Sequence, residues 1–324
     1  MNPWVFSSLL GGIGLKIRYS YLSVVFCCLI FLSQVSAGCL ANSRNEAALE
    51  KSEGSFMMKD PTGVTTADLQ VFYYRPEKWT SDRSVVIVQH GFQRNGKEYR
   101  DGWKEYADKY NILVICPEFS EEKYPGAQYY NMGNMSDTDN EKGNLQPKEK
   151  WTFSVIDHVV DEVKQHFKAT GEFVLFGHSA GAQFVHRYML FSGHDKFSNI
   201  IVANAGWYTM LNRSIDFPYG IKNIPMSDTQ LTKIFAKPVT ILLGEKDNDP
   251  NHKLLRHTRL ADEQGMNRFD RGMQFFNQAR AKAGEMGVQF KWKIITVPGV
   301  GHNDLGMAQA AAQLIFENQD MLVI

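Results

Sequence analysis

Short apolar segments alternate with helical segments along most of this chain, and this alternation constrains the fold more than any other feature. The apolar and β-branched segments cover residues 69–74, 84–89, 112–116, 172–177, 199–205, 238–244 and 290–297. Several are apolar on both faces, as strands buried in a parallel sheet must be. Helical patterns cover residues 96–109, 148–167, 180–191, 266–284 and 305–317. The sequence therefore predicts an α/β fold with a mostly parallel central sheet and helices on both faces.

Composition and charge fit a globular domain and argue against a nucleic-acid partner. Hydrophobic residues make up 44% of the chain and charged residues 22%, which is ordinary for a protein with a sizeable core. The 35 lysines and arginines balance the 35 aspartates and glutamates. No net field therefore draws the protein toward nucleic acid or an acidic surface.

The N-terminus is typical of a secretory signal peptide. Lys16 and Arg18 precede an apolar run over residues 21–32, and the small residues Val35 and Ala37 follow it. A cut after Ala37 would place these two residues at the −3 and −1 positions of the cleavage site. The run is shorter than the ~20 residues that a membrane span needs. We expect residues 1–37 to be removed on export, although the apolar segment 1–15 makes an unusually long start and leaves a membrane-anchoring role open.

The segment after the predicted signal peptide offers a second interpretation. The sequence SAGC at residues 36–39 resembles a bacterial lipobox, with serine where leucine is usual, so a lipid anchor at Cys39 is an alternative to free secretion. Such an anchor would be the only contact with a membrane. Either way, a secreted or periplasmic protein is expected. Residues 38–58 are predicted to form a tether, and residues 59–324 the folded domain.

One motif lies where a predicted strand passes into a predicted helix. In FGHSAG, residues 176–181, Ser179 has Gly177 two positions before it and Gly181 two positions after it. Small residues relieve the crowding of a sharp turn and let the serine hydroxyl stand clear of the backbone. The amides at a helix N-terminus favour developing negative charge. The pattern predicts a nucleophile elbow, against the alternative of a glycine-serine turn of no catalytic use.

A serine alone is a poor nucleophile, so the hypothesis requires a base and an orienting acid. In folds with this elbow they follow in the chain order Ser, Asp, His. Asp247 comes three residues after Gly244 at the end of the predicted strand 238–244, and Asp249 is a competitor two residues later. His302 lies in a glycine-rich loop after the last predicted strand. We predict Ser179, His302 and Asp247 as the catalytic residues, with Asp249 open as the acid.

An oxyanion hole needs two amide donors near the nucleophile. The N–H of Ala180, directly after Ser179, is the first candidate. The second is the N–H of Phe92, in a loop that follows the predicted strand 84–89 and in which Gly91 permits the backbone geometry.

The candidates for substrate binding come from two loops at the carboxyl ends of predicted strands. They are His90, Gly91, Arg94, Trp207 and Tyr208. Arg94 could instead form an internal salt bridge with a group such as Glu118. Trp207 and Tyr208 could instead pack the insertion that follows the predicted strand 199–205.

The segments HGF, GHSAG, GEKD and GVGHND occur in the order found in the α/β-hydrolase superfamily, which the chain resembles across nearly all of residues 60–324. Within it, the chain is similar to secreted esterases grouped with polyhydroxybutyrate depolymerases and feruloyl esterases. The resemblance implies that residues 59–324 form a catalytic domain. It implies a Ser-His-Asp serine hydrolase acting on small-molecule or polymeric carboxylic esters, without metal or organic cofactor.

Two other classes remain open at this point. A serine peptidase of the prolyl-oligopeptidase type would use the same triad, but the chain has no room for the large N-terminal propeller usual there. A non-catalytic envelope binding protein on a hydrolase scaffold is disfavoured because every triad position is filled.

Overall fold

The computed structural model describes residues 52–192 and 195–317. The predicted signal peptide and the alternative lipid-anchor site at Cys39 lie outside the described residues. Among the described residues, none of the helices combines the length and the hydropathy that crossing a membrane requires.

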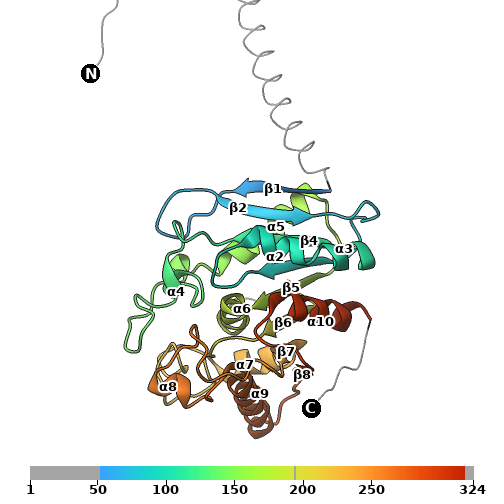
Figure 1. Ribbon diagram of the computed structural model, residues 1–324. Helices are drawn as coiled ribbons and strands as arrows, with labels where there is room; N and C mark the ends of the chain where they lie inside the picture. Colours follow the sequence, from blue (N-terminus) through green and yellow to red (C-terminus); the bar gives the residue numbers. More distant parts are fainter. Residues whose placement is uncertain (1–51, 193–194, 318–324) are drawn as a thin grey trace, which may run out of the picture. The chain divides into compact units, whose positions relative to one another are not determined.

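Within the described residues, eight strands form one sheet in the order β1-β2-β4-β3-β5-β6-β7-β8 (Figure 1). Their bounds are β1 Glu53–Met58, β2 Leu69–Tyr74, β3 Val85–Gln89, β4 Leu113–Glu118, β5 Phe173–His178, β6 Asn199–Ala203, β7 Val239–Gly244 and β8 Lys293–Val297. β2 is antiparallel to both of its neighbours, and every pairing from β4 to β8 is parallel. The prediction of a mostly parallel sheet is confirmed, and its carboxyl ends meet at one edge.

Side chains alternate between two hydrophobic cores, one on each face of the sheet. In β3, Val85 and Ile87 pack into one core, and Val86 and Val88 into the other. The first core also contains side chains of α5 Ser154–His166, α6 Ala180–Phe191, α7 Asp228–Phe235 and α9 Arg268–Glu285. The second contains those of α2 Gly96–Gly102, α3 Lys104–Tyr110 and α10 Asp304–Phe316. Strands that are apolar on both faces are stable here because helices cover both.

The predicted tether over residues 38–58 is wrong at its C-terminal end, because residues 53–58 form the edge strand β1. β1 pairs antiparallel with β2 from Glu53 opposite Tyr74 to Met58 opposite Leu69. Only alternate residues of β1 are shielded from solvent, and of these Phe56 and Met58 pack against the first core. A half-exposed edge strand takes its stability from the neighbouring strand, so its own sequence carries a weak signal.

Helix boundaries differ from the prediction at two places, and one longer helix was missed. The predicted helix 96–109 is divided at Trp103 into α2 and α3, and in the predicted helix 148–167 a 3-10 turn (η1, Lys148–Lys150) precedes α5. The missed helix α7 begins with a capping box, in which the Ser227 side chain and the Gln230 side chain each bond the other's backbone N–H. Serine followed three residues later by glutamine is a sequence signal for that start. Two four-residue helices, α4 Gly126–Tyr129 and α8 Arg259–Asp262, lie in the connections.

Candidate active site

Ser179 occupies the sharp turn between β5 and α6, with φ 57° and ψ −114°. Its flanking glycines are required by close approach of other backbone. A Cβ on Gly177 would lie 2.5 Å from the carbonyl oxygen of Gly181, and a Cβ on Gly181 would lie 2.2 Å from that of Gln89 in β3. The Ser179 N–H donates to the carbonyl of Ala203 at 3.0 Å, which ties the turn to the end of β6. The strained serine conformation is thus held by the strands on both sides.

Replacement of Gly181 by alanine is a direct test of this packing. The new methyl group would collide with β3 backbone, which cannot move aside as a flexible side chain can, so we expect a loss of about 1–3 kcal/mol in the free energy of unfolding. Gly284→Ala in α9 is the matched control. A Cβ there meets no atom within 4 Å, and alanine should stabilise the helix by roughly 0.5–1 kcal/mol. Urea denaturation measures both, and equal midpoints for Gly181→Ala and the wild type would refute the packing account.

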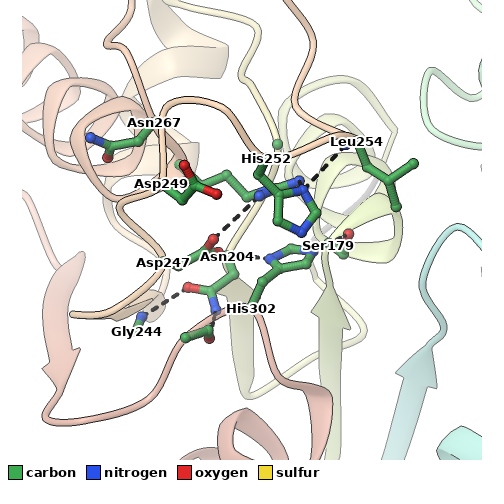
Figure 2. A network of polar contacts seen from close by, with 12 residues as sticks. Ser179, Asn204, Gly244, Asp247, Asp249, His252, Leu254, Asn267 and His302 are labelled. Carbon is green, nitrogen blue, oxygen red and sulfur yellow. Dashed lines mark hydrogen bonds and ion pairs between the residues drawn. The ribbon is translucent and has the colours of Figure 1, made fainter.

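Three side chains from the ends of three strands form one hydrogen-bonded chain (Figure 2). Nε2 of His302 lies 2.9 Å from Oγ of Ser179, and Nδ1 of His302 lies 2.7 Å from Oδ2 of Asp247. Asp247 is buried, whereas Ser179 and His302 are partly exposed. Asp249, the competing acid, accepts a bond from the N–H of Asn251 at the surface and has no contact with His302. The structure thus brings the three predicted residues together and separates Asp249 from them.

The carboxylate of Asp247 has a second partner that the sequence did not indicate. Nη1 of Arg268, in the first turn of α9, lies 3.3 Å from Oδ1 of Asp247, and both side chains are buried. One carboxylate oxygen therefore faces His302 and the other faces a guanidinium. A buried carboxylate is stabilised when both oxygens have donors, so Arg268 helps to hold Asp247 in place.

Asn204 joins the loops that carry the acid and the base (Figure 2). It follows β6 in a left-handed conformation with φ 49°. Its Oδ1 accepts from the N–H of Gly244 at 2.8 Å, and its Nδ2 donates to the carbonyl of Gly301 at 3.1 Å. Gly244 ends β7 just before Asp247, and Gly301 immediately precedes His302. One amide side chain thus fixes the spacing between the two loops.

The loop over residues 90–92 lies beside Ser179, but His90 does not face the substrate. His90 is fully buried, and its Nε2 accepts the N–H of Phe119 at 3.0 Å. Nδ1 therefore carries the proton and donates to the carbonyl of Gly91 at 2.9 Å. Burial lowers the pKa of His90 to about 3, so the ring stays neutral. The substrate-binding prediction for His90 is wrong: the ring anchors the loop from inside.

Phe92 and Ala180 fit the predicted oxyanion hole in one respect. Across the part of the chain that the structure describes, neither backbone N–H donates to a protein acceptor. Gly91 and Phe92 line the same cleft as Ser179, and Phe92 is 64% exposed. A Cβ on Gly91 would lie 2.5 Å from the hydroxyl of Tyr99, so a larger residue here would have to displace that side chain from its contact with His178.

A buried histidine, His178, supports the ring of His302. It directly precedes Ser179, and the two rings lie 4.8 Å apart between centroids. Its Nδ1 lies 2.9 Å from the Tyr99 hydroxyl. Burial lowers the pKa of His178 well below its ordinary value, and His302 and Arg268 lower it further. His178 is therefore an uncharged neighbour that packs against the ring of His302.

The remaining substrate-binding candidates lie away from the cleft. Trp207 is buried against Tyr219 with the guanidinium of Arg187 4.2 Å from its ring, and Tyr208 stacks on Phe275 in the first core. These two residues pack the insertion after β6, which was the alternative interpretation.

Arg94 is likewise structural, although not through Glu118. It donates to the carbonyls of Phe119 and Gly126 and pairs with Glu121 at 3.2 Å. Of the substrate-binding candidates, the structure places only Gly91 at the cleft.

The cleft above Ser179 has a volume of about 310 Å³. Its lining is mixed in character and includes Phe92, Asn95, Glu98, Tyr99, His252, Lys253, Leu254 and Asp304. His252 and Lys253, which follow Asp247 and Asp249 in the chain, were not predicted as cleft residues from the sequence. No group of three or more histidine, cysteine, aspartate or glutamate side chains suited to a metal ion occurs among residues 52–192 and 195–317.

Comparison with known proteins identifies the family. No protein-family model and no curated protein matches the sequence. Among solved structures, a poly(3-hydroxybutyrate) depolymerase from Bordetella parapertussis is 33% identical with a TM-score of 0.78, over 85% of this chain and 94% of its own. A poly(aspartic acid) hydrolase from Sphingomonas sp. KT-1 is 36% identical with a TM-score of 0.76, over 82% of this chain and 98% of its own.

A third solved structure shares the fold at much lower identity. An IroE-like serine hydrolase from Shewanella oneidensis is 11% identical with a TM-score of 0.54, over 82% of this chain and 80% of its own. The sheet order, the turn at Ser179 and the two relatives above 30% identity all point to the same family. The chain belongs to the α/β-hydrolase family and is an enzyme of the hydrolase class.

Proposed function

We propose that this protein hydrolyses carboxylic esters through an acyl-enzyme formed on Ser179. The observation that carries the proposal is the continuous hydrogen-bonded chain from the buried Asp247 through His302 to Ser179, the last two of which line an open cleft. Each group has the partner that its role requires. The nucleophile faces a base, and the base is oriented by a buried carboxylate.

The reaction follows from these positions. Nε2 of His302 accepts the hydroxyl proton as Oγ of Ser179 attacks the ester carbonyl, and Asp247 stabilises the imidazolium that results. The tetrahedral oxyanion is bound by the N–H groups of Phe92 and Ala180. His302 then gives its proton to the departing alcohol. Water enters, gives a proton to His302 and attacks the acyl group. His302 then returns the proton to Oγ of Ser179 as the acyl bond breaks and the acid leaves.

The two relatives above 30% identity frame the choice of substrate. One is described as acting on a polyester and the other on poly(aspartic acid), whose residues are joined by amides. A Ser-His-Asp triad can cleave either bond, so Ser179 alone does not decide between them. We favour small-molecule or polymeric esters because an alcohol leaves more readily than an amine from the same intermediate. Export by the predicted signal peptide, residues 1–37, would bring the enzyme to polymers outside the cell.

A substrate panel on the purified protein tests this proposal. We expect 4-nitrophenyl acetate and butyrate to be hydrolysed with saturation kinetics, and a matched peptide 4-nitroanilide to be cleaved far more slowly or not at all. The same catalytic residues would act on both kinds of substrate, which differ in the leaving group. Faster cleavage of the peptide would identify a peptidase. Inactivity on both, together with failure of an active-site serine reagent to label the protein, would identify a non-catalytic binding protein.

A further inference from the structure

His252 lies in the cleft beside the proposed base (Figure 2). Its ring centroid is 5.6 Å from that of His302, and the two rings meet edge to face. No hydrogen bond joins His252 to Ser179 or to Asp247 in the described structure. The proposed mechanism therefore gives this second histidine no task.

The contacts of His252 settle which of its nitrogens carries the proton. Nδ1 lies 3.2 Å from the backbone N–H of Leu254 and 3.2 Å from Nη2 of Arg268. A backbone N–H and a guanidinium can only donate, so Nδ1 is the acceptor and Nε2 carries the hydrogen. Figure 2 shows the other ring nitrogen turned away from Leu254 and toward His302 and Ser179.

Partial burial and neighbouring side chains favour this neutral form of His252. Partial burial lowers its pKa below the ordinary value, and the neighbouring Arg268 and His302 lower it further, against the opposing effect of Asp247 and Asp249. Arg268 also bonds Asp247 through its other terminal nitrogen, so the guanidinium that orients His252 is itself fixed. The N–H at Nε2 is thus a pre-oriented donor at the cleft surface.

The position of this donor selects one part of the substrate. In the proposed reaction the alcohol departs beside Nε2 of His302, which returns the proton to it. His252 lies next to His302, and it is not part of the 90–92 loop that would bind the oxyanion. We propose that His252 is a specificity residue, whose Nε2–H binds an oxygen acceptor on the alcohol part of the ester. The favoured substrates are then esters whose alcohol carries an ether, carbonyl or carboxylate oxygen a few bonds from the ester oxygen.

This inference rests on the proposed function, and a matched pair of esters separates the two. 2-Methoxyethyl butyrate has an ether oxygen where n-butyl butyrate has a methylene, and the two are otherwise alike. The measured quantity is the ratio of their kcat/KM values. We expect His252→Phe, which keeps a ring but has no donor, to lower this ratio about tenfold relative to the wild type, the effect of one lost hydrogen bond.

A restoring variant and a control complete the experiment. His252→Gln places an amide N–H near the position of Nε2, and should return the ratio to within about threefold of the wild type. His257→Phe removes a histidine that pairs with Asp262 outside the cleft, and should leave the ratio unchanged. If His252→Phe does not fold, His252→Met gives the same comparison. The butyrate ester of 3-hydroxypropanoate extends the series to an anionic acceptor.

The outcomes distinguish the two claims. If the wild type hydrolyses both esters but His252→Phe lowers both kcat/KM values equally, His252 acts only by supporting Arg268 and Asp247, and the specificity role is wrong. An unchanged ratio with unchanged rates refutes it as well. If the wild type hydrolyses neither these esters nor the nitrophenyl esters, the proposed function itself falls.

Discussion

Ser179→Ala is expected to lower kcat/KM for a short-chain ester by several orders of magnitude, about 10⁴-fold or more, because it removes the hydroxyl on which the proposed acyl-enzyme forms. The melting temperature should change little. The hydroxyl is partly exposed in the cleft, its hydrogen-bond partner is His302, and alanine keeps the Cβ that the turn already accommodates. Steady-state kinetics and a thermal melt on the same preparation measure the two effects.

The loss should not grow when the base is removed as well. His302→Ala is expected to cost about as much as Ser179→Ala, and the double variant scarcely more than either, because the residues act as one unit. Additive losses would mean that Ser179 and His302 contribute independently. If Ser179→Ala retained its activity, or if its stability fell while its activity did not, Ser179 would have only a structural role in the turn.

Asp247→Asn is expected to lower kcat by about 10³- to 10⁴-fold, while Asp249→Asn stays close to the wild type. An asparagine amide at position 247 can donate to Nδ1 of His302, which then holds the proton on Nε2 and cannot accept one from Ser179. The substitution also removes the negative charge facing Arg268, so some loss of stability accompanies the loss of activity.

Asp249→Asn is the matched control for this prediction, because Asp249 lies two residues away and accepts only a local surface bond. Kinetics should be recorded well below the unfolding temperature of each variant. The assignment of the acid would be overturned if Asp249→Asn lost the activity and Asp247→Asn kept it.

The fold could be predicted because its signals are local and repeated. Buried parallel strands are apolar on both faces, as Val85 to Val88 of β3 are, and helices separate them. β1 could not be recognised, because a half-exposed edge strand depends on the pairing of Glu53–Met58 with β2 and not on its own composition.

The residues that meet at the elbow were predictable for a geometric reason. The turn at Ser179 needs Gly177 and Gly181 next to it, and parallel strands deliver Asp247 and His302 to the same edge of the sheet. Spacing alone could not choose between Asp247 and Asp249. That choice depends on the turn after β7, in which the N–H of Asp247 bonds the carbonyl of Gly244.

The surroundings of the elbow could not be predicted, because they depend on contacts between distant parts of the chain. Trp207 looked like a pocket residue but is buried against Arg187 and Tyr219. Arg268 reaches Asp247 from α9, 21 residues later in the chain. His252 is oriented by that guanidinium together with the backbone N–H of Leu254. Glycine-rich motifs mark the proposed nucleophile in the sequence. Residues that orient another side chain, or that are proposed to select the substrate, belong to no such motif.

The measurement that tests the central claim most directly is covalent labelling with an organophosphonate. Such reagents react with a serine only when a neighbouring base activates it and the oxyanion is stabilised. Intact-mass analysis should show one adduct on the wild-type protein, peptide mapping should place it on Ser179, and Ser179→Ala should remain unlabelled. Labelling at another residue, or equal labelling of Ser179→Ala, would contradict the assignment of Ser179 as the nucleophile.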